Sequence, residues 1–400
     1  MIDETSAVND APTLPYNLVE EEILCRLPVK YLLQFRCVCK SWNSLISDPR
    51  FAKKHLSMST TCRLHFIRRC CHPRGTIASC PLQCIFTNTS CRSKNKNSKK
   101  NKKKPTVCIN VTQLKYPSYR SNYPPHVFVG SCNGILCLAH EFSIDDSLVV
   151  ILWNPSLRKV KELPQSHYPN LSRISYGFGY DFVTDNYKVV AVLCFTVHNS
   201  SGDLLEKAVV KINTMGTNFW RNIQEFPFDS MIGNTVPGIF VSGTINWLAS
   251  KCWRKSPCFI VSLDLGTESY QKLLMPDYGE VNVNFLNLCV LRDCLCIISG
   301  HDVWIMKEYG NKESWTKLFN VSYKGEPSMS NELFNAVYMF EDGQVLFESS
   351  EDGRYNMIVH DPRIGTIKYI KFQDKSVHNS PGGYDNYPIV CVESLISPCF

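Results

Sequence analysis

The sequence contains none of the short patterns that mark common catalytic and phosphate-binding sites. It has no G-x-x-x-x-G-K segment, no H-E-x-x-H pair and no G-x-S-x-G turn, so the usual signatures of a phosphate loop, a zinc peptidase and an α/β-hydrolase are missing. Gly177-Phe178-Gly179 is a partial glycine motif without its third glycine, and strand-like residues follow it. The ten histidines are scattered. We therefore expect no catalytic residue and no cofactor.

Cysteine pairs at metal-binding spacing are also missing, although the chain has 20 cysteines. No C-x-x-C occurs, and structural zinc sites usually show such pairs. A zinc site formed by the cysteines of residues 57–91 with His65 and His72 is one interpretation of this segment. The absent pairs favour the other interpretation, a β-hairpin or two with buried free cysteines. We expect no metal site.

Signals for secretion and membrane insertion are absent as well. The first ten residues are acidic and have neither a basic stretch nor an apolar stretch, so we expect no secretory signal. No apolar run approaches the roughly 20 residues of a membrane-spanning helix. The cysteines are then expected as reduced thiols in a protein of the cytoplasm, the nucleus or both.

The positive charge of the chain comes from one segment. Residues 92–104, RSKNKNSKKNKKK, hold eight basic residues and no acidic one, whereas the formal net charge of the whole chain is +7. The remainder is close to neutral, so we do not expect it to bind nucleic acid. The basic insert itself is expected to be disordered, either as a bare surface loop or as a nuclear localisation signal.

Residues 14–51 have the apolar spacing of three short helices. Val19, Ile23 and Leu27 stand at i, i+4 and i+8, and Pro28 ends this helix because it has no N–H to donate. A second apolar set recurs at three- and four-residue steps up to Asp48-Pro49: Leu32, Phe35, Val38, Trp42 and Leu45. About forty residues cannot bury so much apolar surface by themselves. The spare face must pack either on the rest of this chain or on a partner.

From residue 107 onward the pattern changes to short apolar strands separated by turn residues. Five units repeat an apolar strand, a polar turn and a second strand, with turn positions 59, 51, 43 and 54 residues apart: Asn154, Asn213, Asp264, Lys307 and Asp361. An irregular period near 50 is typical of kelch-like propeller blades. Five tryptophans recur in these units and are expected in blade cores rather than along a ligand groove: Trp153, Trp220, Trp247, Trp304 and Trp315.

The helical segment resembles an F-box. The resemblance lies in Leu14-Pro15, in the run ILCRLPVK from Ile23 and in the run FRCVCKSW from Phe35, with one residue more than the family pattern around residues 20–22. It implies binding to a Skp-type adaptor and, through it, to a cullin of a ubiquitin ligase. The residues that it implies as adaptor contacts are Leu14, Pro15, Val19, Ile23, Leu24, Leu27, Pro28, Val29, Leu32, Leu33, Phe35, Val38 and Trp42.

The strand-rich part resembles the F-box-associated domain of plant F-box proteins, whose S-locus F-box branch has a similar layout. The motifs that carry the resemblance follow one another in the family order: SCNG at 131–134, LWNP at 152–155, YGFGYD at 176–181, YKVV at 187–190, DVWIM at 302–306 and ESW at 313–315. The fold class is therefore expected to be α+β multidomain, with a small helical F-box followed by an all-β kelch-like propeller.

The expected domains follow from these patterns. They are a disordered N-terminus at 1–13, the F-box at 14–56, a linker with first strands and the basic insert at 57–106, and the propeller at 107–396. The resemblance implies a non-catalytic substrate-recognition subunit of an SCF-type ubiquitin ligase, whose propeller loops bind an unidentified target protein. The alternatives are a scaffold that binds the adaptor without ubiquitination of a target, and a propeller enzyme with paired carboxylates or a metal in its channel.

Overall fold

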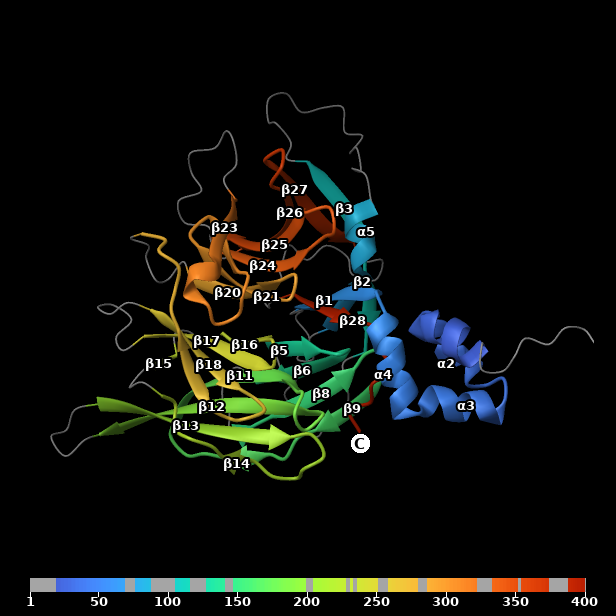
Figure 1. Ribbon diagram of the computed structural model, residues 1–400, viewed down its shortest axis with the longest axis horizontal. Coiled ribbons are helices and arrows are strands. Elements are labelled where there is room, and N and C mark those ends of the chain that lie inside the picture. The colour runs from blue at the N-terminus through green and yellow to red at the C-terminus, as the bar shows by residue number, and fades with distance from the viewer. Residues whose placement is uncertain are drawn as a thin grey trace, which may run out of the picture.

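The computed structural model places a small helical region beside a ring of β-sheets (Figure 1). The residues that it describes are 19–68, 76–87, 105–115, 127–140, 147–198, 204–227, 231–232, 236–250, 258–279, 286–321, 333–351, 354–373 and 388–399. The N-terminus predicted to be disordered and the basic insert 92–104 lie outside this description.

The helical region is a series of short helices that turns at proline and aspartate residues. Its elements are η1 (Val19–Ile23), η2 (Leu24–Arg26), α2 (Val29–Phe35), α3 (Lys40–Ser47) and α4 (Pro49–Met58). Asp48 separates the last two helices, and its carboxylate accepts a hydrogen bond of 2.7 Å from the backbone N–H of Arg50. Pro49 fits the first turn of α4, where a backbone N–H has no helical partner. The predicted stop at 48–49 therefore both ends α3 and begins α4.

The first predicted helix is not a regular α-helix. Val19–Ile23 is π-helical, and Leu24–Arg26 continues as a 3₁₀-helix. A π-helical turn closes its hydrogen bond over i to i+5, one residue more than the α-helical turn. This geometry accommodates the additional residue that the sequence carries around positions 20–22.

The β domain consists of six sheets of four or five strands among the described residues, which form the blades of a six-bladed propeller. Blade 1 contains β28 (Ile389–Val392), β1 (Cys62–Arg68), β2 (Thr76–Pro81) and β4 (Thr112–Leu114). Blade 2 contains β5 (Val127–Cys132), β6 (Ile135–Ala139), β8 (Val150–Asn154) and β9 (Lys159–Glu162). Blade 3 contains β11 (Leu171–Asp181), β12 (Asn186–His198), β13 (Leu204–Thr214) and β14 (Arg221–Asn222).

The other three blades follow the same antiparallel order, with two additions. Blade 4 contains β16 (Ile239–Val241), β17 (Thr244–Ser250), β18 (Phe259–Asp264) and β19 (Tyr270–Leu273), and β15 (Met231–Ile232) also pairs with β17. Blade 5 contains β20 (Leu286–Leu291), β21 (Cys294–Ser299), β22 (Asp302–Met306) and β23 (Trp315–Asn320). Blade 6 contains β24 (Leu333–Met339), β25 (Val345–Glu351), β26 (Arg354–Asp361), β27 (Thr366–Gln373) and β3 (Thr106–Asn110). A small sheet of β7 (Ser147–Leu148) and β10 (Ser166–His167), α5 (Leu82–Thr87) and η4 (Lys312–Ser314) complete the elements.

The first strand of each blade lines the centre of the ring. Neighbouring blades touch through these strands in the closed order β28, β5, β11, β16, β20, β24 and back to β28. Gly177 of β11 and Gly238, directly before β16, form a parallel bridge. In a closed ring each blade packs on its neighbours, and apolar clusters of described residues fill the spaces between blades 1 and 6, 3 and 4, and 5 and 6.

Blade 1 is built from both ends of the chain. Its inner strand β28 comes from the C-terminal part and pairs antiparallel with β1, so that Arg63 lies opposite Cys391. The pairing covers the edge that β1 would otherwise expose. Because β1 and β2 belong to this blade, we propose that the propeller begins near residue 62 rather than at 107.

The segment between 57 and 106 is partly helical. The expected hairpin is present as β1–β2, but α5 follows it directly and packs on β1, β2 and β3. Beyond it, β3 pairs in parallel with β27 as a fifth strand of blade 6, with Val107 opposite Ile370. Cys80 is buried in the cluster between blades 1 and 6.

The predicted turn positions occupy the same place in five blades, at the connection from the third strand to the fourth. Asp264 accepts a hydrogen bond of 2.7 Å from the backbone N–H of Thr267, and Asp361 accepts one of 3.1 Å from that of Arg363. Asn and Asp side chains are suited to such turns because they can bond backbone groups two or three residues ahead.

Candidate functional site

The structure places the predicted adaptor contacts in three environments. Leu14 and Pro15 lie outside the described residues. Leu24, Val29 and Leu32 are buried within this chain. The remaining eight keep accessible surface. Five of them are half-buried: Val19, Leu27, Leu33, Phe35 and Trp42. The other three are exposed: Ile23, Pro28 and Val38. Three of the predicted contacts thus pack in the core of this chain, and eight remain accessible at its surface.

The most accessible apolar surface of the helical region lies around α2 and the turn into α3. Val38 is 62% exposed in that turn, and Tyr31 of α2 is 49% exposed. The rings of Phe35 in α2 and Trp42 in α3 pack against each other with centroids 5.4 Å apart. Arg36 donates a hydrogen bond of 3.2 Å from Nε to Oδ1 of Asn43, which ties the two helices together. Tyr31 was not predicted as a contact, although its position next to Leu32 placed it on α2.

Buried contacts fix the position of Leu27 and Pro28. The ring of His55, from α4, is 2% exposed, and its Nε2 lies 2.9 Å from the carbonyl oxygen of Leu27. The pair links the segment between η2 and α2 to the last helix of the region. The exposed Pro28 is therefore presented on a rigid support.

The helical region is attached to one end of the ring (Figure 1). Lys53 of α4 forms an ion pair with Asp185 in the turn between β11 and β12. Ser59, directly after α4, donates a hydrogen bond of 3.2 Å to the carbonyl oxygen of Glu393. Arg63 lies 3.6 Å from the Glu393 carboxylate. The first two contacts join the helical region to blades 3 and 1, and the third lies within blade 1.

The C-terminal segment fills the space between the helices and blade 2. Leu395 and Ile396 belong to the same apolar cluster as Leu24 and Leu32. Asn154 holds this segment through its side-chain Nδ2, which donates to the carbonyl oxygens of Ser394 at 3.1 Å and Ile396 at 2.7 Å. Asn154 therefore has a structural role in fastening the end of the chain.

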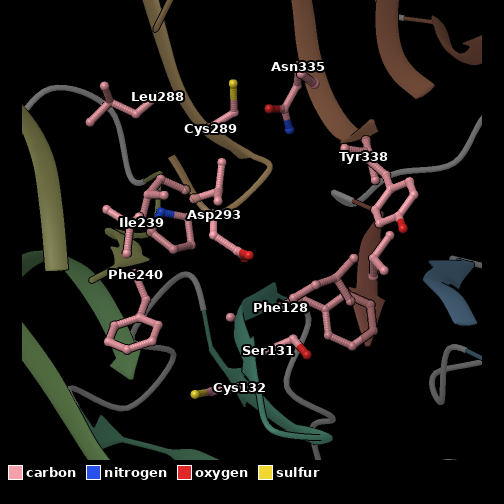
Figure 2. Close-up of a pocket in the computed structure, with 18 of the residues that line it drawn as sticks. Phe128, Ser131, Cys132, Ile239, Phe240, Leu288, Cys289, Asp293, Asn335 and Tyr338 are labelled. Atoms are coloured by element: carbon pink, nitrogen blue, oxygen red, sulfur yellow. The ribbon is translucent and has the colours of Figure 1, made fainter. Parts of the chain in front are cut away.

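A cavity of about 1090 Å³ occupies the centre of the ring. Its walls come from the inner strands and their turns, and Phe128, Phe240 and Tyr338 supply aromatic surface (Figure 2). Figure 2 shows the Asp293 carboxylate and the Asn335 amide directed into the space between these rings. None of the five tryptophans noted in the sequence lines the cavity, and Trp153, Trp247 and Trp315 are buried in the blades.

Glu348 is a buried carboxyl at the wall of this cavity. It is 5% exposed and stands opposite Asn335 in the pairing of β25 with β24. Burial raises the pKa of Glu348 to about 7, whereas its hydrogen bond with the Asn335 side chain acts in the opposite direction. A carboxyl with this pKa changes its charge near neutral pH.

The cavity carries acidic groups but no arrangement that indicates catalysis. Asp293 and Glu341 line it together with Glu348, and Arg292 is the one guanidinium among the described lining residues. No group of three or more His, Cys, Asp or Glu side chains that could hold a metal ion occurs in the part of the chain that the structure describes. The described helices include none that is long and apolar enough to cross a membrane.

Comparisons with known proteins match both parts of the chain. Residues 14–54 match the F-box domain, and residues 85–398 match the F-box associated β-propeller domain. An F-box/kelch-repeat protein of Arabidopsis thaliana is 31% identical over 89% of this chain and 93% of its own length. The F-box protein CPR1 of Arabidopsis thaliana is 27% identical over 84% of this chain and 79% of its own. Among solved structures, the β-propeller domain of the Trilobed protease from Pyrococcus furiosus gives a TM-score of 0.34 at 13% identity over 74% of each chain, too distant to bear on function.

Proposed function

Because this chain belongs to the F-box proteins that carry an F-box associated β-propeller domain, we propose that it is the substrate-recognition subunit of an SCF-type ubiquitin ligase. Members of this family are typically non-catalytic adaptors. The F-box would bind a Skp-type adaptor and through it a cullin, while the propeller would bind the protein to be ubiquitinated.

The observation that carries the proposal is the apolar surface that the helical region leaves uncovered. Ile23, Tyr31 and Val38 are each at least 40% exposed, although the buried residues of the same helices pack tightly in this chain. Exposed apolar groups that gather on one small region commonly mark a protein interface. Of the predicted contacts, Leu33 lies in α2, and Leu27 and Pro28 form the link between η2 and α2.

The proposed mechanism is proximity and does not require chemistry from this chain. A ligase subunit that binds a target on one side and the adaptor on the other holds a target lysine near a charged ubiquitin carrier. The effective concentration of the lysine then rises without any new reactive group. We also propose that the protein works in the cytoplasm, the nucleus or both, where such ligases meet their targets.

Binding of the full chain to a purified Skp-type adaptor tests the proposal. Ile23→Asp with Val38→Asp places two charges in the exposed apolar surface and should abolish co-purification with the adaptor. Leu27→Ala with Pro28→Ala should weaken it by at least about tenfold, because truncated interface anchors typically cost more than 1 kcal/mol. Phe219→Asp alters a residue of the propeller that is 59% exposed and serves as the control.

Unchanged adaptor binding by the Ile23→Asp and Val38→Asp protein would overturn this assignment of the surface. Circular dichroism and the melting temperature of each variant must match those of the wild type, so that lost binding is not caused by unfolding. A complex that binds the adaptor but attaches ubiquitin to no captured protein would instead favour a scaffold.

A further inference from the structure

The central cavity has two ends with different surroundings. β11 leads into the turn that carries Asp185, the partner of Lys53, and β28 ends beside the start of β1, directly after α4. The inner strands therefore end toward the helices and begin at the opposite end of the ring. Asp293 follows β20 in the turn on the helix side, whereas Phe128 and Asn335 stand near the beginnings of their strands.

The far end is where a target would approach, because the helices and the adaptor occupy the other side. Asn335 pairs with Glu348 near this far end. The Glu348 carboxyl is thus a buried acid in the wall of the channel.

No cationic side chain among the described residues that line the cavity bonds the buried carboxyl. Asn335 is the side chain that bonds it, and an amide donates a hydrogen bond without neutralising the charge. Three carboxyl groups line the cavity against one guanidinium, that of Arg292, which is exposed in the turn on the helix side. Buried charges are normally paired, so a carboxylate at this position is suited to a cationic ligand.

We propose that the far end of the channel binds a lysine or arginine side chain of the target protein, with Glu348 as its counter-charge and the aromatic lining against its apolar stem. Lysine and arginine combine an apolar stem with a charged head, and aromatic faces attract such heads as well. The cavity, at about 1090 Å³, is larger than one such side chain and leaves room for neighbouring residues of a peptide. This inference rests on the proposed function, since it names the part of the target that the propeller recognises.

Four fluorescein-labelled heptapeptides test the proposal by fluorescence polarisation with the full chain bound to its adaptor. They share a Phe-X-Leu centre, in which X is arginine, lysine, citrulline or glutamate. Arginine and lysine peptides should bind at least about tenfold more tightly than the citrulline peptide, which has nearly the shape of arginine but no charge. Glu348→Gln should remove that preference.

The matched control is Asp277→Asn, which neutralises an exposed carboxyl outside the cavity. It should leave the preference for the cationic peptides unchanged, so that a loss on Glu348→Gln reports the buried site and not the net charge. Binding of 4-phenylbutylamine, measured in the same assay, tests whether the site takes a small amine instead of a peptide side chain. Amine binding that requires Glu348, without any peptide binding, would overturn the peptide proposal in favour of a small-molecule site.

Three other results would overturn the proposal. These are equal binding of the arginine and citrulline peptides, no binding of either cationic peptide at about 1 mM, and an undiminished preference in Glu348→Gln. Adaptor binding is measured on the same samples. A failure of peptide binding with intact adaptor binding refutes only the cation site, whereas a wild-type chain that does not bind the adaptor refutes the proposed function.

Discussion

Individual side chains set the pH response of the propeller, and Glu348 is the clearest case. Its pKa in the folded protein is raised from 4.5 to about 7 because the carboxyl is buried. The folded state therefore keeps a proton in a pH range where the unfolded chain has lost it. Stability contributed by this group is fully present below pH 4.5, falls as pH rises toward 7 and is constant above.

Glu348→Gln should remove this pH dependence. The other charged groups at the cavity, Arg292, Asp293 and Glu341, remain in the variant. We expect the variant to gain stability over the wild type by up to roughly 3 kcal/mol at pH 8 and to gain little at pH 4.5. Urea unfolding at the two pH values measures the difference. The same pH response in both proteins would show that Glu348 is not held protonated by burial.

A second residue-scale feature is the ion pair between Asp181 and Lys188. The side chains are 0% and 5% exposed, and their charged atoms are 2.8 Å apart. Lys188 also bonds Glu268 at 2.9 Å and the carbonyl oxygen of Leu265 at 2.6 Å, both from the turn between β18 and β19. This network joins blade 3 to blade 4, with Asp181 and Lys188 buried and Glu268 18% exposed.

Asp181→Asn should destabilise the protein by about 3 kcal/mol, because it leaves the buried ammonium of Lys188 with one carboxylate in place of two. Glu225→Gln breaks the exposed pair of Lys207 and Glu225 and should cost no more than about 1 kcal/mol. The free energy of unfolding is measured for both variants. Equal effects would mean that burial does not strengthen the Asp181 pair.

At the scale of elements, the C-terminal segment acts as the fastening of the ring. It passes so close to the turn between β5 and β6 that a side chain at Gly134 has no room. A Cβ there would lie 2.1 Å from Ser394 Oγ and 2.9 Å from the carbonyl oxygen of Val392. Ser394 also donates a hydrogen bond of 2.7 Å to the carbonyl oxygen of Asn133.

Gly134→Ala should therefore destabilise the fold more than the matched change Gly343→Ala. Both glycines have positive φ, +83° and +88°, so each alanine costs roughly 1–2 kcal/mol of backbone strain. A Cβ at Gly343 meets nothing within 4 Å. The excess loss in Gly134→Ala, measured by urea unfolding, isolates the contact with the C-terminal segment. Equal losses of unfolding free energy in the two variants would show that the C-terminal segment moves aside at no energetic cost.

Removal of residues 388–400 should open the ring. Blade 1 would lose its inner strand, and the edge of β1 would become exposed. We expect calorimetry to show that the cooperative transition of the propeller is lost or moves to a much lower temperature. A truncated protein with an unchanged melting transition would contradict closure by β28.

For the whole molecule, the repeating turns made the propeller predictable. Asn154, Asp264 and Asp361 stand at equivalent turns, so their spacing revealed five blades. The spacing of turn residues did not predict blade 1, because its strands come from both ends of the chain and α5 directly follows its third strand.

The candidate sites were predictable only in part. Apolar spacing identified the helical stripe, but it could not tell which members the chain itself buries, since Leu24 and Leu32 share their cluster with the distant Leu395. The channel gave no sequence signal, because its lining is drawn from the inner strands of all six blades. Glu348 in particular lies in a second strand and belongs to no motif.

The whole molecule also separates two surfaces. The helices attach at one end of the ring (Figure 1), and the proposed target site lies in the channel away from them. A target held at the far mouth and an adaptor bound at the helices would not compete for the same residues. Changes in the helical surface should therefore remove ubiquitination without removing target capture.

Ubiquitin attachment to captured proteins tests the role as a substrate receptor most directly. Wild type and the Ile23→Asp, Val38→Asp variant are used to capture partners under proteasome inhibition, and ubiquitin remnants on those partners are quantified by mass spectrometry. We predict that both proteins capture the same partners, and that only the wild type carries the adaptor and ubiquitinated partners. Equal ubiquitin remnants on partners of both proteins, with adaptor binding lost in the variant, would contradict this role.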